Sequence, residues 1–340
     1  MYNEKHILII YAGGTIGCEG SAHGLRPMKP MAFTEHLKAY LNKGTDSLPR
    51  FSVMEMKRPI DSSSLDPKTW FDLALKIQSY KAKYDGFVLL HGTDTMAYTS
   101  SALSLLLYQI KKPVIVTGSM KPLMSTNSDA VKNIFNAVKF ACSPGLKGVY
   151  LLFGNGLWRG ARATKSHAND MEAFDAPNDV AVADTCQADQ SIVCKTIEAE
   201  VELSEVIWGL KKPEVIVMRF FPGISYRFIS AILAHHPNGV VIETYGAGNG
   251  PIGDRKILKA IKDACDRGTI FVAVTQCGEG KVNQGLYKAG KIFKDIGVLS
   301  GGDMTLEAAF TKLYCLLSSD LSPSRIKKIM PINLYGEVSP

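Results

Sequence analysis

Short apolar runs alternate with helical patterns along most of the chain. Eight runs have the length of buried strands, and most of them are continuously apolar; they are residues 6–12, 50–57, 86–92, 113–119, 148–154, 214–220, 239–246 and 269–277. Parallel strands that are covered on both faces are typically apolar throughout rather than alternating. The pattern therefore predicts an α/β fold of two doubly wound domains with mostly parallel sheets.

One region interrupts this alternation. From about residue 184 to residue 212 the chain becomes polar and irregular before the strand pattern resumes. We therefore expect a larger N-terminal catalytic domain over residues 1–190, a linker over residues 191–212, and a smaller C-terminal α/β domain over residues 213–340. A length of 340 residues suits two domains of this kind.

Composition narrows the classes of function. Hydrophobic residues make up 46% of the chain and charged residues 21%, which excludes a disordered chain and a coiled coil. The net charge of +7 is spread along the chain without a polybasic arm, so we expect no nucleic-acid partner. No stretch of 18 apolar residues is present, and the apolar run near the N-terminus is short for a secretory signal. We therefore expect a cytoplasmic protein without membrane association.

The cysteines and the known sequence signatures agree with this view. The seven cysteines are scattered and include no C-x-x-C pair, as in reduced intracellular proteins. No paired cysteine or histidine spacing indicates a metal, and no Walker A or G-x-S-x-G sequence is present. Residues 248–253 match G-x-G-x-x-G, but the acidic residue of a dinucleotide site has only a late candidate, Glu279. We expect neither a metal nor a cofactor.

Two Gly-Thr elements follow predicted strands. Gly14-Thr15 follows the first strand, and Gly92-Thr93-Asp94 follows the third. In open parallel sheets, ligands bind outside the carboxyl ends of the strands, so both threonine hydroxyls are candidates for chemistry. A threonine hydroxyl becomes an effective nucleophile only when a neighbour removes its proton or stabilises its anion. Each element alone fits a tight turn or a helix cap equally well.

Three further segments could complete such a site. Residues 17–30 read as a loop with glycines and prolines that could fold over a substrate. Lys165 follows the fifth predicted strand, although an isolated lysine is usually a solvated surface charge. Asp61, Ser62 and Ser63 follow the second strand, where they could hold a substrate carboxylate or simply form an Asx turn.

Taken together, these segments resemble a known family. YAGGTIG at residues 11–17 and GFVLLHGTDTMAYTSSALS at residues 86–104 are similar to the two signature segments of the L-asparaginases. TGSMKPL, RATKSHA, FPGIS, YGAGNGP, TQCGEGKVN and GGDMTLEAAFTKL match in order, so the resemblance covers nearly the whole chain. The form most resembled is the bacterial cytoplasmic, type I enzyme.

The resemblance implies hydrolysis of the side-chain amide of L-asparagine to L-aspartate and ammonia, without a cofactor. It implies that Thr15 is the nucleophile and that Thr93, Asp94 and Lys165 form the group opposite it. It also implies a homotetramer, which is a dimer of dimers. Glutaminase activity is a further, minor possibility. The implied substrate-binding residues, the last two reaching a neighbouring subunit's site, are Asp61, Ser62, Ser63, Thr93, Asp94, Asn249 and Glu307.

Two positions depart from the family's pattern. Leu25 stands in the loop where many relatives have a tyrosine that assists the nucleophile. Some type I relatives bind a second asparagine near the positions of Thr164, Tyr245 and Cys277, and Glu243 stands where such a relative has arginine. An allosteric site at these residues therefore stays open.

Two other functions also stay open. One is an amidotransferase subunit that releases ammonia for a tRNA-modifying partner. Such proteins carry an extra domain before the first Gly-Gly-Thr motif, and in this sequence that motif begins at residue 13. The other is a non-catalytic amino-acid sensor, which would fit the missing tyrosine. All the matched threonine, aspartate and lysine residues are present, which favours an enzyme.

Overall fold

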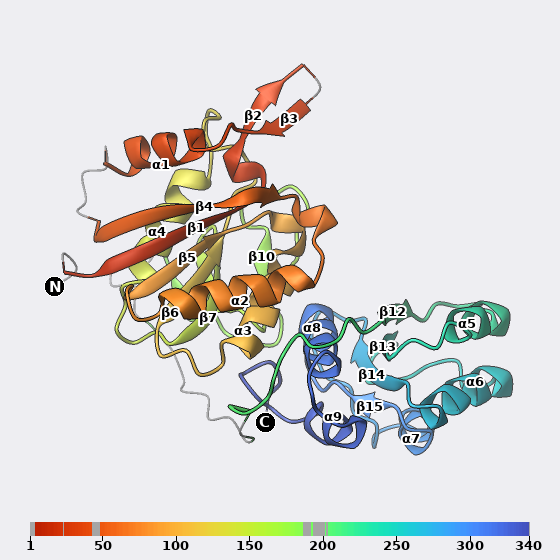
Figure 1. Ribbon diagram of the computed structural model, residues 1–340. Helices are drawn as coiled ribbons and strands as arrows, with labels where there is room; N and C mark the ends of the chain where they lie inside the picture. The colour runs from red at the N-terminus through yellow and green to blue at the C-terminus, as the bar shows by residue number, and fades with distance from the viewer. Residues whose placement is uncertain are drawn as a thin grey trace. The chain divides into compact units, whose positions relative to one another are not determined.

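Two compact units make up the chain in the computed structural model (Figure 1). Unit 1 comprises Met1–Thr196 and unit 2 comprises Ile197–Pro340. Part of the expected linker over residues 191–212 lies outside the described residues, so its limits stay a prediction. The two-domain α/β class with a larger N-terminal unit is confirmed. The structure describes residues 4–22, 24–42, 48–185, 192, 201 and 203–339.

A seven-stranded sheet forms the centre of unit 1. Its strands are β1 (His6–Gly13), β4 (Arg50–Ile60), β5 (Gly86–Leu90), β6 (Pro113–Thr117), β7 (Gly148–Phe153), β8 (Gly156–Arg159) and β11 (Ala183–Asp184). Neighbours β7, β6, β5, β1 and β4 run parallel in that order, and β8 and β11 add antiparallel pairs beside β7. Every residue of β5 and β6 is buried, which explains their unbroken apolar sequences.

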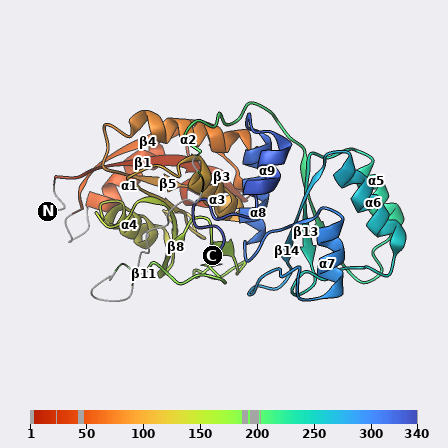
Figure 2. The same ribbon diagram turned by 90° about the horizontal axis from the view of Figure 1, so that it is seen from below.

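Two helices cover each face of this sheet. They are α1 (Ala32–Asn42) and α4 (Ala130–Phe140) on one face, and α2 (Lys68–Tyr80) and α3 (Met96–Leu106) on the other. Along β1, Ile7 and Ile9 pack in the core that includes α1 and α4, whereas Leu8 and Ile10 pack in the core that includes α2 and α3. Successive side chains of a strand point to opposite faces, so one apolar run supplies both cores. Figure 2 shows α2 and α4 on opposite sides of the sheet.

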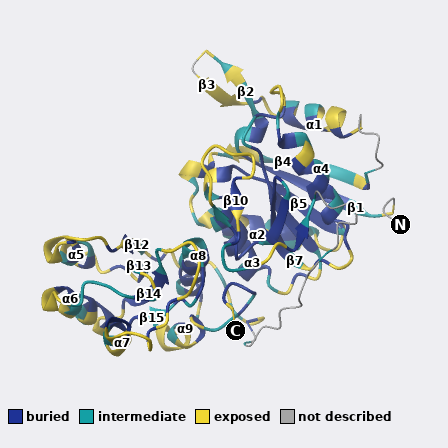
Figure 3. Ribbon diagram, turned by 180° about the vertical axis from the view of Figure 1, so that it is seen from behind, coloured by how far each residue is buried: buried dark blue, intermediate teal, exposed yellow. Residues whose placement is uncertain are grey.

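Residues 17–30 are not the irregular loop that the sequence suggested. Most of them form an antiparallel hairpin of β2 (Cys18–Ser21) and β3 (Gly24–Pro27). Glu19 lies opposite Arg26 in the register, and the two side chains form a 3.0 Å ion pair. All of β3 is exposed (Figure 3). Because this hairpin lacks the apolar alternation of a half-buried strand, hydrophobic patterning did not detect it.

The order of strands reverses at β1. From β1 the chain crosses to the edge strand β4 and then returns past β1 to β5, so β4 and β5 lie on either side of β1. The loops after β1 and β5 therefore leave the sheet at a topological switch point, which is where open α/β sheets bind ligands. The predicted site residues Thr15 and Thr93 follow these two strands.

A four-stranded parallel sheet forms the centre of unit 2. Its strands, in spatial order, are β12 (Val215–Arg219), β13 (Gly239–Thr244), β14 (Ile270–Thr275) and β15 (Leu299–Ser300). Its helices are α5 (Tyr226–Leu233), α6 (Arg255–Asp266), α7 (Lys288–Asp295), α8 (Leu306–Leu317) and α9 (Pro323–Ile329). In the described part of both units, no helix has the length and apolar character needed to cross a membrane.

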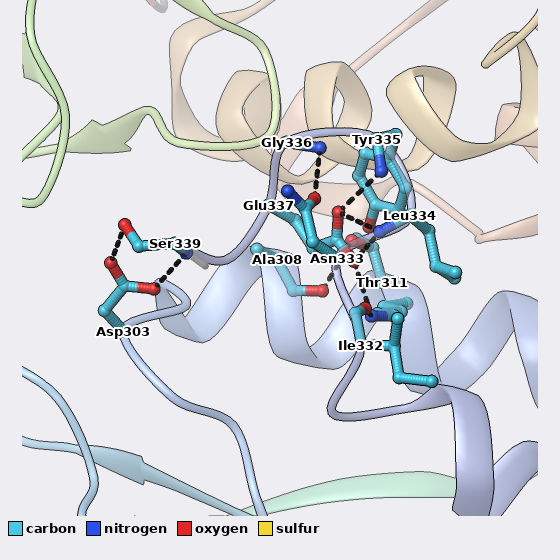
Figure 4. Close-up of polar contacts among 11 residues, drawn as sticks. Asp303, Ala308, Thr311, Ile332, Asn333, Leu334, Tyr335, Gly336, Glu337 and Ser339 are labelled. Carbon is cyan, nitrogen blue, oxygen red and sulfur yellow. Dashed lines mark hydrogen bonds and ion pairs between the residues drawn. The ribbon is translucent and has the colours of Figure 1, made fainter. Parts of the chain in front are cut away.

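A buried ion pair anchors the C-terminal segment of unit 2 to α8. Lys312, within α8, contacts the Glu337 carboxylate, and both side chains are fully buried. The carboxylate also accepts the backbone N–H groups of Leu334 and Tyr335, as Figure 4 shows. Lys312 Nζ donates in addition to the Ile332 carbonyl at 2.6 Å. The segment after α9 is therefore held by charge-assisted hydrogen bonds in the interior.

Candidate active site

Three loops from neighbouring strand ends lie in direct contact in unit 1. A Cβ atom on Gly14, after β1, would lie 2.5 Å from Gly92 Cα, after β5. A Cβ atom on Gly92 would lie 2.4 Å from Ser62 Oγ, after β4. Glycine at both positions therefore allows the segments that carry Thr15, Thr93 and Ser62 to meet. The two Gly-Thr elements come together at the switch point of the sheet.

Substituting Gly14 with alanine should force these loops apart. Gly14 has a φ of 90°, which disfavours an L side chain, and its Cβ would have no room against Gly92. We expect Gly14→Ala to lower the free energy of unfolding by at least about 2 kcal/mol. Gly20→Ala is the matched control, since a Cβ there would meet no atom within 4 Å. Urea denaturation of both variants measures the difference, and equal stabilities would contradict the contact.

Lys165 joins this group from a separate two-stranded sheet. It lies in β9 (Thr164–Lys165), which pairs antiparallel with β10 (Phe174–Asp175). Its Nζ atom donates to Thr93 Oγ1 at 2.9 Å and to Asp94 Oδ1 at 2.8 Å. The Lys165 side chain is 21% exposed and the Asp94 side chain 62%, so the lysine is the shielded partner. Lys165 is therefore not a solvated surface charge.

The Thr-Asp-Thr segment does not act as a helix cap. It forms the 3₁₀ turn η3 (Thr93–Thr95), and Thr95, at the N-cap position of α3, makes no side-chain capping hydrogen bond. Thr95 Oγ1 donates instead to the Ser62 carbonyl at 2.8 Å. This bond ties the loop after β5 to the loop after β4, while the neighbouring Thr93 and Asp94 side chains bind Lys165.

Thr15 begins a second 3₁₀ turn, η1 (Thr15–Gly17), directly after β1. Backbone hydrogen bonds brace this turn from two sides. The Leu123 N–H donates to the Ile16 carbonyl, and the Met28 N–H donates to the last carbonyl of the turn, each at 3.0 Å. The half-buried Thr15 side chain therefore stands on a backbone fixed by the loop after β6 and by the end of the β2–β3 hairpin.

Cys18 follows the same turn but is held as a neutral thiol. Its Sγ atom donates to the Gly14 carbonyl at 3.5 Å. Burial, and in second place the charge of Asp61, raise the pKa of the Cys18 thiol. Because a cysteine reacts as the thiolate, a raised pKa keeps it unreactive. Thr15 is therefore the stronger nucleophile candidate in this turn.

The loop after β4 forms the Asx turn that the sequence allowed. Asp61 Oδ1 accepts the Ser63 N–H at 3.0 Å at the start of η2 (Ser62–Ser64). Ser62 is buried, whereas Asp61 and Ser63 are exposed. The turn thus presents a carboxylate and a hydroxyl to solvent beside the contacting loops. The role of these groups in substrate binding stays a prediction.

The other predicted site residues belong to unit 2, apart from Thr164 in β9. Tyr245 and Asn249 exchange backbone hydrogen bonds as an isolated antiparallel bridge after β13. Cys277 is exposed after β14, and Glu307 lies in the first turn of α8. The contribution of Asn249 and Glu307 to a substrate site, and the second amino-acid site, stay predictions.

Both departures from the family pattern have defined surroundings. Glu243 lies opposite Arg219 in the register of β12 and β13, and their side chains form a 3.4 Å ion pair. The carboxylate at this position therefore has a cation beside it from the neighbouring strand. Leu25 is 56% exposed on β3.

A buried hydrogen-bond chain behind Thr93 was not expected from the sequence. Trp70 Nε1, in α2, donates to Thr99 Oγ1, in α3, at 3.2 Å, and Thr99 Oγ1 lies 3.0 Å from His91 Nε2. His91 Nδ1 lies 2.8 Å from the Gly92 carbonyl oxygen. Burial lowers the pKa of His91, so its ring is neutral near pH 7. Tryptophan and threonine on apolar helices look like core residues, and only the fold shows that they reach His91.

The fold and the site together define a class of protein. It is a two-domain α/β protein with threonine hydroxyls and a lysine–aspartate pair at the switch point of its larger sheet. Among the described residues, no group of three or more His, Cys, Asp or Glu side chains could hold a metal ion.

Comparison with protein-family models identifies the family. The model described as Asparaginase, N-terminal matches residues 6–197, and the model described as Glutaminase/Asparaginase C-terminal domain matches residues 214–330. The chain belongs to the asparaginase family.

Individual relatives agree with this assignment. L-asparaginase 1 of Escherichia coli (strain K12) is 39% identical over 99% of both chains. The crystal structure of L-asparaginase I from Vibrio cholerae matches with a TM-score of 0.85 at 37% identity, over 99% of both chains. A glutamyl-tRNA(Gln) amidotransferase component of Pyrococcus furiosus is 30% identical over 83% of this chain, but only 65% of that relative is covered.

Proposed function

We propose that this protein hydrolyses the side-chain amide of L-asparagine to L-aspartate and ammonia, with Thr15 as the nucleophile. The observation that carries the proposal is the contact of Lys165 with Thr93 and Asp94, on a loop that packs against Gly14. This arrangement offers one hydroxyl for attack and a second, lysine-bound hydroxyl for proton transfer. Membership of the asparaginase family over both units supports it.

The proposed reaction has two steps. Thr15 Oγ1 forms a bond to the amide carbon while its proton passes to the Thr93 hydroxyl, whose own proton passes to Lys165, which takes part in this step as the neutral amine; the C–N bond then breaks and ammonia leaves with that proton. Water next hydrolyses the Thr15 ester, which releases aspartate and restores the hydroxyl. Lys165 Nζ, 2.9 Å from Thr93 Oγ1, is within proton-transfer distance of that hydroxyl.

The substrate's charged groups are assigned to the polar side chains around this centre. Asp94 is proposed to bind the α-ammonium group, and Asp61, Ser62 and Ser63 to hold the α-amino and α-carboxyl groups. The exposure of the Asp94 and Asp61 carboxylates supports this assignment. One extra methylene changes transition-state binding by only about 1–3 kcal/mol, so glutamine is expected as a minor substrate.

The assembly and location form part of the same proposal. We expect a cytoplasmic homotetramer, a dimer of dimers, without nucleic-acid or membrane partners, in which Asn249 and Glu307 reach a neighbouring subunit's site. The resemblance to type I enzymes supports this, as do the free cysteines in the described residues, which are Cys18, Cys142, Cys265, Cys277 and Cys315. Light scattering during size-exclusion chromatography tests the mass, and a monomer would contradict the assembly.

Replacing Lys165 with methionine tests the proton-transfer group. Methionine is unbranched and only one heavy atom shorter than lysine, but it can neither accept a proton from Thr93 nor donate one to it. We expect the kcat for ammonia release from L-asparagine to fall by about 10²–10⁴-fold. Lys132→Met is the matched control because Lys132 lies on the surface of α4 and binds Asn155. Equal kcat values for Lys165→Met and wild type would refute the proposed role.

One alternative function has a specific observation behind it. An amidotransferase component is among the relatives of this chain, although the match covers only 65% of that relative. A chain of this kind would co-purify with a tRNA-binding partner and release little ammonia on its own. Full asparaginase activity of the purified chain would exclude this alternative.

A further inference from the structure

The buried hydrogen-bond chain behind the site ends on the peptide group that precedes Thr93. The Gly92 carbonyl, bound by His91, and the Thr93 N–H belong to the same planar peptide group. Holding that carbonyl toward His91 therefore directs the Thr93 N–H to the opposite side. Trp70, Thr99 and His91 are each at most 2% exposed, so water does not compete for these contacts.

The partners of His91 assign its proton. A carbonyl oxygen carries no hydrogen, so Nδ1 donates to Gly92. In the neutral ring Nε2 then carries no proton and accepts a hydrogen bond from the Thr99 hydroxyl. Thr99 in turn accepts the Trp70 indole N–H. Each hydrogen bond of the chain is thus donated in the same direction, from α2 through α3 to the loop after β5.

We propose that His91 is a positioning residue for the reaction, whose Nδ1–H fixes the Gly92–Thr93 peptide and thereby sets the Thr93 hydroxyl against Lys165. The Gly92 backbone also packs against Gly14, so a shift of this peptide would reach the Thr15 loop as well. His91 acts through Gly92 and contacts no reacting group itself. The inference rests on the proposed asparaginase function, which it deepens.

Thr99→Val tests the inference without changing His91. Valine keeps the shape of threonine but has no proton to donate to Nε2, so the interaction that selects the ring's tautomer is lost. We expect kcat for L-asparagine to fall about tenfold while KM stays within about twofold, because the substrate-binding groups are untouched. Thr99→Ser keeps the hydroxyl and should keep kcat within about twofold of wild type.

Thr117→Val is the matched control. Thr117, in β6, is fully buried, and its hydroxyl has no hydrogen-bond partner in the part of the chain that the structure describes. The same chemical change there should leave kcat and KM unaltered. The inference is overturned if Thr99→Val keeps kcat within about twofold of wild type, or if Thr117→Val loses as much activity.

A second measurement needs no substrate. In ¹⁵N NMR of the histidine-labelled protein, His91 should show a protonated Nδ1 and an unprotonated Nε2 at neutral pH. Its signals are identified by their absence in His91→Asn or, if that variant does not fold, by their shift in Thr99→Val. A protonated Nε2 would overturn the inference even in an active asparaginase. If wild type releases no ammonia, the proposed function fails, and the tautomer result still decides the hydrogen-bond chain by itself.

Discussion

Replacing Thr15 with alanine should lower the kcat for ammonia release from L-asparagine by at least about 10³-fold. The reason is that the proposed reaction forms its covalent bond at the Thr15 hydroxyl, which alanine lacks. The Cys18 thiol, at the end of the same turn, has a pKa raised by burial and donates to the Gly14 carbonyl. A colorimetric ammonia assay under saturating L-asparagine measures the effect.

The fold should not change in this variant, because Thr15 is only half-buried and its turn is braced through the backbone. Circular dichroism and the thermal midpoint should therefore match wild type. Thr15→Ser, which restores a hydroxyl, should recover a measurable part of the activity. Full activity in Thr15→Ala would refute the proposed nucleophile. An unfolded variant would contradict the expectation that the Thr15 side chain is not needed for folding.

The parallel strands were predictable because their physical cause is visible in the sequence. A strand such as β5, buried on both faces between α2–α3 and α4, must be apolar at every position. The β2–β3 hairpin has no such requirement. β3 is exposed throughout, and a Glu19–Arg26 ion pair joins it to β2, a signal that hydrophobicity does not record.

The site was predictable to a similar extent. Strand ends and the resemblance predicted that Thr15 and Thr93 lie near each other, because the carboxyl ends of parallel strands lie at one edge of the sheet. The contact of Lys165 with Thr93 depends on a two-residue strand, β9, and its pairing with β10, which no periodicity can indicate. His91 and Thr99 meet only because α3 packs beside the end of β5, so their hydrogen bond could be found only in the structure.

The second large effect concerns stability. Lys312→Met should lower the free energy of unfolding by about 3–5 kcal/mol, because it leaves the Glu337 carboxylate in the interior beside a neutral side chain. Breaking a buried ion pair costs more than the pair contributes, since the remaining charge keeps its full desolvation cost. The same change also removes the donor to the Ile332 carbonyl. The loss should therefore loosen the whole C-terminal segment.

Two comparison variants separate this charge effect from lost packing. Lys312→Met/Glu337→Gln removes both charges yet keeps an oxygen at the position of Oε2, which accepts both the Leu334 and the Tyr335 N–H groups, so it should regain much of the stability. Lys259→Met breaks the exposed ion pair with Asp263 on α6 and should have no measurable effect. Urea denaturation of the three variants gives the order of their free energies of unfolding. If the double variant is no more stable than Lys312→Met, the loss comes from packing around α8 rather than from the buried carboxylate.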